Sequence, residues 1–238
     1  MLITTPAIVL SIIKYNDADA VIKAYTAQTG FTNFFIRGFF KGRKNRSWKA
    51  IFQPGALAEL VFNFKNKGQL EHIKDGRILY HYKTLHQDFD KLNIATFLRE
   101  VLLESLKNEQ ADTDLFQFIF EKFVALDQKK FNPDFHLIFL LQLTQYLGFF
   151  PDIQSEGTFF DLQDAVFTKQ IPLNPYLTEV ESQLFRYFSG MIFATEKEIK
   201  ITQLERKKLI DMLLRFYRYH IIHFNMPKSV KILHQIYE

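Results

Sequence analysis

The sequence predicts an α+β fold, in which a small barrel of five strands is followed by a domain of helices. The first 80 residues contain five short runs that are rich in β-branched and aromatic residues and are separated by turn-forming residues. After about residue 88 the apolar residues instead recur at the spacing of an α-helix. Because 47% of the 238 residues are hydrophobic, each part has enough apolar side chains for a core of its own.

The clearest of the five predicted strands is 56–64, where Ala58, Leu60, Phe62 and Phe64 share one face at period two. We recognise no helix among the runs, and an OB barrel is the commonest architecture for such a set of strands. The runs lie at 7–13, 21–29, 31–38, 56–64 and 70–82. They predict an OB domain over residues 1–82.

Residues 83–238 are predicted to be helical, apart from a short irregular or hairpin insertion near 149–176. The segment from Asn132-Pro133 to Gly148 is apolar on nearly every side, so we expect it to be the central, most buried helix. Two capping boxes mark the starts of later helices. Two other helices are expected before the central one, at 94–102 and from Asp112 or Thr113 to about Leu126. Three are expected after it: one starts at Thr178-x-x-Glu181, one runs from Thr202-x-x-Glu205 to Met226, and a short one starts at Lys228. Ile221 and Phe224 are expected on the apolar face of the helix that ends at Met226.

Positive charge is concentrated in the barrel. Residues 1–80 carry 12 Lys and Arg against 5 Asp and Glu, a net charge of +7, whereas residues 81–238 carry 18 against 21, a net charge of −3. A basic part beside a slightly acidic remainder indicates an anionic partner for the barrel. The alternative is chance clustering of cations on a solvated face.

The strongest local feature is the segment 37–49, which holds six cations and no anion, with Phe residues before and within it. Cations pair with phosphates and exposed aromatic rings stack on unpaired bases, so this segment predicts nucleic-acid binding that is largely independent of sequence. The alternative is a solvated loop whose Phe residues anchor it in the core. The candidate binding residues are Arg37, Lys41, Arg43, Lys44, Arg46, Trp48 and Lys49.

A second basic group lies in a predicted hairpin between the last two strands. Lys65 and Lys67 flank Asn66, with Lys74 and Arg77 beyond them. We predict that Lys65 and Lys67 extend the nucleic-acid surface, and the alternative is ordinary solvated turn chemistry.

The sequence contains no motif of a catalytic or metal site. There is no cysteine, no phosphate-binding loop and no zinc-protease or serine-hydrolase motif. His220 and His223 have a spacing found in metal sites, but no nearby carboxylate completes the set, so structural or surface roles are expected. We predict a protein that is not an enzyme and binds no metal or cofactor. We also expect no signal peptide, no membrane span and a cytoplasmic location.

Several stretches resemble the RecO family of bacterial recombination mediators. In the barrel part, residues 5–10 (TPAIVL), 15–19 (YNDAD) and 24–30 (AYTAQTG) are similar to the family's first two strands. The basic segment 37–49 and residues 53–55 (QPG) resemble its charged loop and following strand. In the helical part the similar stretches are 143–151 (LTQYLGFFP), 217–220 (YRYH) and 228–229 (KS).

The resemblance implies an N-terminal OB fold and a C-terminal helical domain. It also implies binding of single- and double-stranded DNA, annealing of complementary strands, contact with the tail of the single-stranded DNA-binding protein, and help with RecA loading together with RecR, in association with the nucleoid. Some family members carry a four-cysteine zinc site after the element that 143–151 resembles. The corresponding stretch 152–166 has no cysteine, so we expect Phe159, Phe160 and Phe167 to hold the hairpin by packing.

Three other functions are consistent with parts of the pattern. A generic OB protein that binds RNA would share the basic, aromatic barrel. A nuclease would need carboxylates clustered around a divalent metal. An adaptor that binds only proteins would carry the basic segment as a solvated face.

Overall fold

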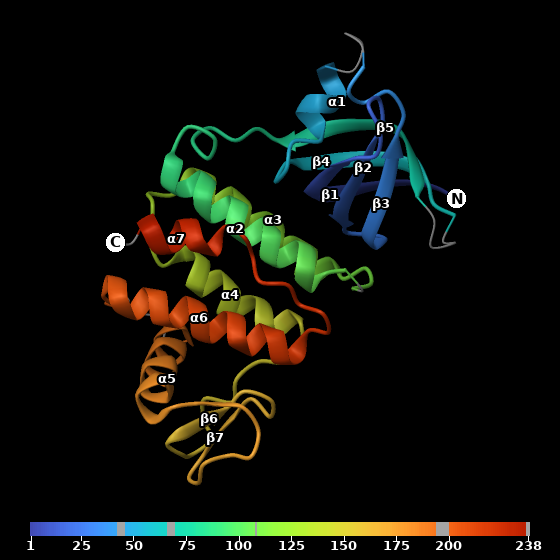
Figure 1. Cartoon of the computed structure of the whole chain (residues 1–238). Coiled ribbons are helices and arrows are strands. Elements are labelled where there is room, and N and C mark those ends of the chain that lie inside the picture. Colours follow the sequence, from blue (N-terminus) through green and yellow to red (C-terminus); the bar gives the residue numbers. More distant parts are fainter. Residues whose placement is uncertain (42–45, 66–69, 108, 194–199, 237–238) are drawn as a thin grey trace. The chain divides into compact units, whose positions relative to one another are not determined.

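The computed structural model describes the chain except residues 42–45, 66–69, 108, 194–199 and 237–238. It separates into two compact units, Met1–Phe131 and Asn132–Glu238 (Figure 1). The predicted α+β class is confirmed, because strands form a closed barrel in the first unit and helices supply most of the chain after it. None of the helices in the described ranges combines the length and apolar character needed to cross a bilayer.

The barrel closes in the order β1-β2-β3-β5-β4, with β4 returning to β1. All of its pairings are antiparallel except β3 with β5, where only Phe34 and Phe35 pair with Glu71 and His72. This is the five-stranded OB barrel that the sequence predicts. Its strands are β1 (Leu2–Lys14), β2 (Ala20–Thr26), β3 (Gly30–Ile36), β4 (Leu57–Asn63) and β5 (Glu71–Tyr80).

A short helix, α1 (Arg46–Ile51), lies between β3 and β4, so the expectation of strands without a helix was wrong. Ile51 and Phe52 are buried in the barrel core, and Trp48 packs against the same cluster. These apolar residues have helical spacing, but a segment of six residues is too short to give a periodic signal in the sequence. A helix of this length is also not stable by itself. Packing on the barrel therefore stabilises α1.

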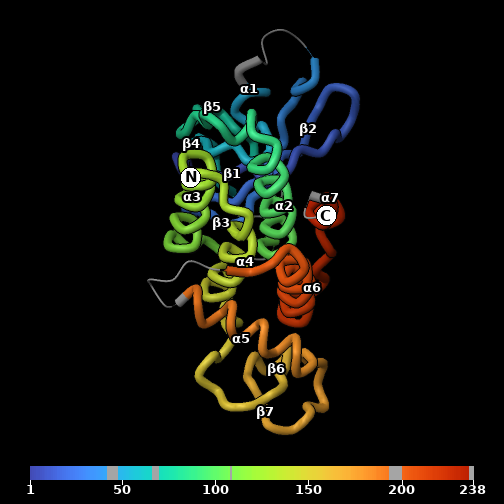
Figure 2. The backbone as a smooth tube through the Cα atoms, turned by 90° about the vertical axis from the view of Figure 1, so that its left-hand side faces the viewer, coloured from blue at the N-terminus to red at the C-terminus, as the bar shows by residue number. Residues whose placement is uncertain are grey.

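Two helices of the first unit lie side by side beneath the barrel strands, α2 (Phe89–Ser105) and α3 (Thr113–Gln128) (Figure 2). Asp112 caps α3 by accepting the Leu115 N–H at 2.9 Å, one of the two predicted caps. Arg99 of α2 donates to the Leu10 carbonyl of β1 at 2.7 Å. Gly30, with φ of 66°, lies so close to residues 109–111 that a Cβ would come within 2.5 Å of backbone atoms.

The link between β5 and α2 is fixed by one buried carboxylate, Asp127 near the end of α3. Its oxygens accept the backbone N–H groups of residues 83, 84 and 85 at 2.8–3.0 Å and the Tyr80 hydroxyl at 2.8 Å. The ammonium of the buried Lys91 donates to the carbonyls of Asp127 and Lys129, both at 2.8 Å. The end of α3 and the start of α2 are thus joined to the link through the buried side chains of Asp127 and Lys91.

The second unit is built on the apolar helix α4, whose buried residues include Leu137, Phe139 and Leu140. The helix begins at Phe135, later than predicted, because Asn132 accepts the Asp134 N–H in a turn before it. The insertion forms a three-stranded sheet in the order β7-β6-β8. The elements are α4 (Phe135–Tyr146), β6 (Phe159–Asp161), β7 (Val166–Thr168), β8 (Tyr176–Leu177), α5 (Glu179–Phe193), α6 (Gln203–His220) and α7 (Val230–Ile236).

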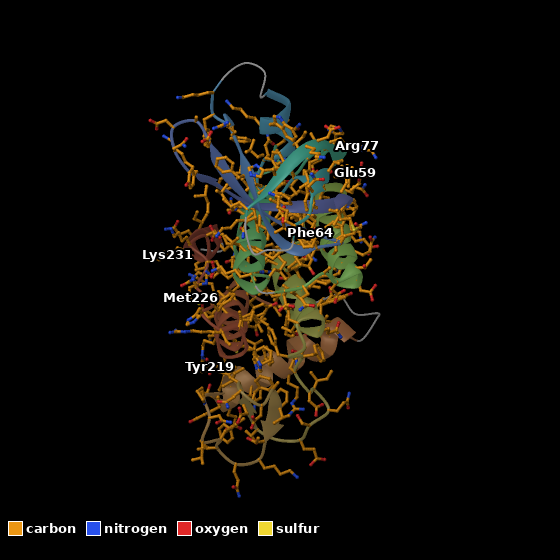
Figure 3. All side chains as sticks on the ribbon, turned by 90° about the vertical axis from the view of Figure 1, so that its right-hand side faces the viewer. Glu59, Phe64, Arg77, Tyr219, Met226 and Lys231 are labelled. Atoms are coloured by element: carbon orange, nitrogen blue, oxygen red, sulfur yellow. The ribbon has the colours of Figure 1, made fainter. Side chains whose placement is uncertain are left out.

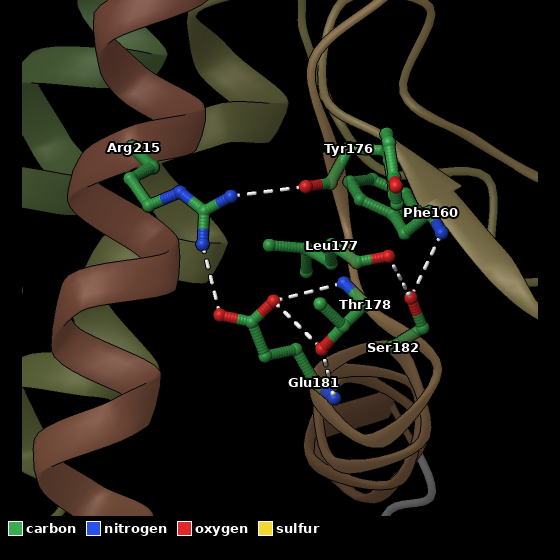
Figure 4. A network of polar contacts seen from close by, with 7 residues as sticks. All are labelled: Phe160, Tyr176, Leu177, Thr178, Glu181, Ser182 and Arg215. Atoms are coloured by element: carbon green, nitrogen blue, oxygen red, sulfur yellow. Dashed lines mark hydrogen bonds and ion pairs between the residues drawn. The ribbon is translucent and has the colours of Figure 1, made fainter. Parts of the chain in front are cut away.

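Both predicted capping boxes are present, at Thr178 with Glu181 and at Thr202 with Glu205. Figure 4 shows that Glu181 also pairs with Arg215 of α6, with Nη1 and Oε1 2.9 Å apart. The expected course of α6 was wrong at its end. The helix stops at His220, so Phe224 lies beyond it, although that ring is still buried.

The insertion is held by aromatic packing, as predicted, and by one arginine that was not predicted. The rings of Phe160 and Phe167 are buried with centroids 4.8 Å apart. The Arg186 guanidinium lies 3.6 Å from the Phe167 ring centroid and donates to the carbonyls of residues 153, 155 and 157 at 3.0–3.2 Å. The chain has no cysteine, so the four-cysteine site implied for some members of the resembled family cannot form here, and Arg186 binds three carbonyls of this loop.

Replacing Arg186 with Lys is expected to loosen the insertion, because an ammonium cannot reproduce the planar fork that reaches three carbonyls and stacks on Phe167. We expect a loss of about 2 kcal/mol in the local free energy of opening. Hydrogen exchange of amides 155, 158 and 167 measures it. Lys169→Arg, at an exposed position directly after β7, is the control, and equal protection in both variants would contradict the role of Arg186.

Candidate nucleic-acid interface

Arg37 and Lys41 are exposed on the turn that follows β3. Gly38 between them has φ of 68°, a conformation that a residue with a side chain rarely adopts. Its N–H donates to Asp19 Oδ1 at 2.7 Å, and the Phe40 N–H donates to the Ala18 carbonyl at 2.8 Å. The turn that carries these cations is therefore fastened to the loop between β1 and β2.

The Asp19 carboxylate interacts electrostatically with both Arg37 and Lys41. The Gly38 N–H first, and then the Asn16 amide, lower the pKa of the Asp19 carboxyl, with smaller contributions from the two cations. No carboxylate among the described residues forms an ion pair with Arg37. The Asp19 side chain thus positions the turn by accepting the Gly38 N–H, while the guanidinium of Arg37 stays exposed to solvent.

The remaining predicted residues of this segment lie in or before α1. Lys49 is exposed, whereas Trp48 is half-buried and stacks on Phe52, with centroids 5.5 Å apart and an interplanar angle of 15°. Trp48 also lies against Gly76 of β5, where a Cβ would be 3.5 Å from its ring. Trp48 therefore holds α1 on the barrel, and its contact with DNA stays a prediction. Arg43 and Lys44 lie outside the described residues, and Arg46 is the first residue of α1.

The members of the second basic group differ in whether their charge is compensated by a carboxylate. Lys65 is exposed, and its backbone N–H donates to the buried Glu71 carboxylate at 2.9 Å. Lys67 lies outside the described residues. Arg77 is paired with Glu59, with Nε and Oε1 2.7 Å apart, and this partner raises the pKa of its guanidinium (Figure 3). Lys65 is thus available to a polyanion, while the charge of Arg77 is compensated.

An aromatic row that sequence reasoning missed lies beside these cations. Tyr15, 64% exposed, meets Phe35 edge to face at 5.5 Å, and Phe35 meets the exposed His72 in the same way at 5.8 Å. These residues come from the loop between β1 and β2, from β3, and from the start of β5. OB folds bind oligonucleotides on the face of strands 2 and 3 and the loops at 1–2 and 4–5, which is where this row and Lys65 lie.

The signal for the row was incomplete in the sequence. Phe35 is one of several Phe residues before the basic segment, and neither Tyr15 nor His72 belongs to a recognisable motif. The row forms because β3 and β5 pair in parallel with Phe35 opposite His72. A parallel pairing between strands separated by α1 and β4 leaves no local pattern in the sequence.

The candidate metal spacing of His220 and His223 does not bring the two side chains together on a helix. His220 stacks on Phe149 at 4.7 Å and its Nε2 lies 2.8 Å from the Leu162 carbonyl, while burial lowers the pKa of its imidazole. His223 lies beyond α6 with φ of 58°. Within the described part of the chain, no three His, Asp or Glu side chains are grouped so that they could hold a metal ion.

Replacing Tyr15 with Ala is expected to weaken binding of single-stranded DNA by about 1–3 kcal/mol, because a base loses its aromatic partner. Fluorescence anisotropy with a labelled oligothymidine at fixed salt measures the loss. Phe89→Ala removes an aromatic ring that is 68% exposed on α2 of the same unit, and it should leave the affinity unchanged. Equal losses in the two variants would contradict a specific role for Tyr15.

Comparisons with known proteins agree with this barrel and helical arrangement. Residues 1–82 match the family model described as Recombination protein O N terminal, and residues 86–229 match the one described as Recombination protein O C terminal. The chain is 35% identical over 239 aligned residues to a DNA repair protein RecO of Christiangramia forsetii and 34% identical over 238 to one of Flavobacterium psychrophilum. Both alignments cover all of this chain and all of the relative.

The two family models meet between residues 82 and 86 and together cover most of the chain. The relatives are similar to it from end to end and carry a DNA repair name. The chain therefore belongs to the RecO family of DNA repair proteins.

Proposed function

We propose that this protein is a DNA-binding recombination mediator that acts without bond chemistry. It anneals complementary single strands and, together with RecR, assists RecA loading on DNA coated with single-stranded DNA-binding protein. The observation that carries the proposal is the group of exposed cations, Arg37, Lys41 and Lys65, beside the aromatic row Tyr15, Phe35 and His72.

Electrostatics supports annealing by such a surface. Two strands repel each other through their phosphates, and a dense cationic surface reduces this repulsion while it raises the local concentration of strands. Aromatic rings hold bases by their faces and are indifferent to base identity. A mediator that anneals any pair of complementary strands needs both properties.

The partners follow from family membership and are part of the proposal. The protein would bind single- and double-stranded DNA in the nucleoid of the bacterial cytoplasm, contact the C-terminal tail of single-stranded DNA-binding protein, and act on RecA indirectly. The decisive experiment is strand annealing on oligonucleotides coated with single-stranded DNA-binding protein. Acceleration over the coated strands alone supports the proposal, and no acceleration at any protein concentration refutes it.

The combined variant Arg37→Ala, Lys41→Ala, Lys49→Ala is expected to bind all oligonucleotide sequences more weakly and by similar factors. If each cation meets one phosphate of a single strand, the slope of log K against log salt becomes shallower by about 2. Anisotropy titrations at several salt concentrations with two unrelated sequences give both results.

The matched control is Lys83→Ala, Lys129→Ala, Lys130→Ala, which removes three exposed cations of the same unit. Its slope should stay within about half a unit of the wild-type slope. A loss confined to one of the two sequences would contradict phosphate binding, because it would indicate base readout.

A further inference from the structure

The end of the chain carries a second concentration of positive charge. Residues 212–237 contain Arg215, Arg218, Lys228 and Lys231 and three histidines but no Asp or Glu, although residues 81–238 as a whole are slightly acidic. Arg215 is compensated by Glu181. The other three Lys and Arg residues form no ion pair with any residue that the structure describes.

These three cations are exposed on a short stretch of the chain that also exposes an aromatic ring, Tyr219. We define the C-terminal basic surface by its exposed members, which come from the last turn of α6, the segment after it and the first turn of α7. Figure 3 shows Tyr219, Met226 and Lys231 along one edge of the second unit. The members are Arg218, Tyr219, His223, Lys228 and Lys231.

Buried residues next to the members of the C-terminal basic surface fix the backbone that carries them. Phe216 and Tyr217 of α6 are fully buried, and the Tyr217 hydroxyl donates to the Leu140 carbonyl of α4 at 2.7 Å. Phe224, Ser229 and Leu233 are also buried, so they anchor the segment after α6 and the helix α7 at three points. Arg218, Lys228 and Lys231, which lie between these anchors, are exposed to solvent.

The position of Lys231 argues against a purely structural role for the charge. Arg218 lies in the last turn of α6, where a cation stabilises the helix through the helix dipole. Lys231 lies in the first turn of α7, where the same interaction disfavours a cation. Its charge therefore does nothing for the helix that carries it, whereas it adds to the potential of the surface.

We propose that the C-terminal basic surface binds a second single strand of nucleic acid, while the barrel holds the first. Three phosphates would pair with Arg218, Lys228 and Lys231, and Tyr219, which is 47% exposed, offers a ring face to a base. This rests on the proposed function, because annealing brings two strands together and a second strand site on the same chain is one way to do so. It assigns DNA binding to the helical part of the chain as well, although the net charge of residues 81–238 is slightly negative.

The test uses the full chain and two non-complementary oligothymidines, one labelled with a donor and one with an acceptor dye. Energy transfer reports two strands in one complex, and mass photometry counts the protein copies in it. The wild-type protein should form complexes of one chain with two strands. Arg218→Ala, Lys228→Ala, Lys231→Ala should bind the first strand within about threefold of wild type and the second at least tenfold more weakly.

Two further variants make the result specific. Lys169→Ala, Lys200→Ala, Lys208→Ala removes the same charge from other exposed sites of the second unit and should still bind both strands. Arg218→Lys, Lys228→Arg, Lys231→Arg keeps the charge and should also behave as wild type. Thermal melting checks that all variants fold.

Each other outcome overturns the inference. Two-strand complexes that persist in the triple alanine variant, or that always contain two protein copies, exclude a second strand on this surface. A variant that keeps the second strand but no longer binds poly-glutamate would assign the surface to an acidic peptide instead. If the wild-type protein binds one strand and never two, only this inference fails, whereas absence of first-strand binding refutes the proposed function itself.

Discussion

Replacing Asp127 with Ala is expected to lower the free energy of unfolding by about 3–5 kcal/mol, the range for losing one partner of a buried charged network. The carboxylate accepts three consecutive backbone N–H groups between β5 and α2 and the Tyr80 hydroxyl. Without it these donors lose their acceptor, and the N–H of the buried Leu85 is left unsatisfied. Urea denaturation measures the loss, and hydrogen exchange of amides 83–85 locates it.

Glu121→Ala is the control, because Glu121 is an exposed carboxylate on the same helix. It should change the free energy of unfolding by no more than about 0.5 kcal/mol. If the two variants are equally stable, the network around Asp127 is not what fixes the link.

The same carboxylate predicts a dependence of stability on pH. Burial by itself would raise the pKa of Asp127, but the N–H groups of residues 83–85 and the Tyr80 hydroxyl outweigh it and lower the pKa to about 2. A carboxyl with a depressed pKa in the folded state stabilises the protein above its unfolded pKa near 4. About 2 kcal/mol of stability should therefore be lost as the pH falls from about 4 to 2.

This acid-dependent loss should be smaller in Asp127→Ala, because the variant has no such carboxyl to protonate. Urea denaturation curves at pH 5, 3 and 2 provide the comparison. Identical pH profiles for the variant and the wild type would show that other carboxyls cause the acid sensitivity.

Replacing Arg206 with Met is expected to destabilise the second unit by about 3–5 kcal/mol. Arg206 Nε of α6 lies 2.6 Å from Oδ1 of Asp134 before α4, and both side chains are less than a tenth exposed. Burial raises the pKa of the Asp134 carboxyl, while the Arg206 hydrogen bond and charge lower it. Loss of the guanidinium leaves a buried carboxylate with no compensating cation.

A double variant, Arg206→Met with Asp134→Leu, should recover most of this stability, because two apolar side chains replace the pair without leaving a buried charge. Thermal unfolding followed by circular dichroism measures all three proteins. Lys208→Met, an exposed position on α6, is the control. A double variant as unstable as Arg206→Met would indicate that the cost comes from packing and not from the unpaired carboxylate.

Local sequence patterns predicted the fold where the responsible contacts are local. The alternation of Ala58, Leu60 and Phe62 identifies the buried face of β4, and both capping boxes identify helix starts. α1 was missed because its stability comes from Trp48 and Phe52 packing on the barrel. Such a contact joins residues that are far apart in the sequence.

The candidate site was predictable in part for the same reason. The density of cations in 37–49 is visible along the chain, and the structure places Arg37, Lys41 and Lys49 on the surface. The aromatic row was not predictable, since it depends on the parallel pairing of Phe35 with His72. Likewise, the compensation of Arg77 by Glu59 depends on two strands being adjacent.

The attachment of α2 and α3 to the barrel determines how the protein can be divided. The family match for the first domain ends at residue 82, yet the first compact unit extends to Phe131. Cutting at residue 82 would remove the partners of Leu10 and Gly30 and expose the apolar barrel surface that these helices cover. A soluble fragment for crystallisation or titration should therefore retain both helices.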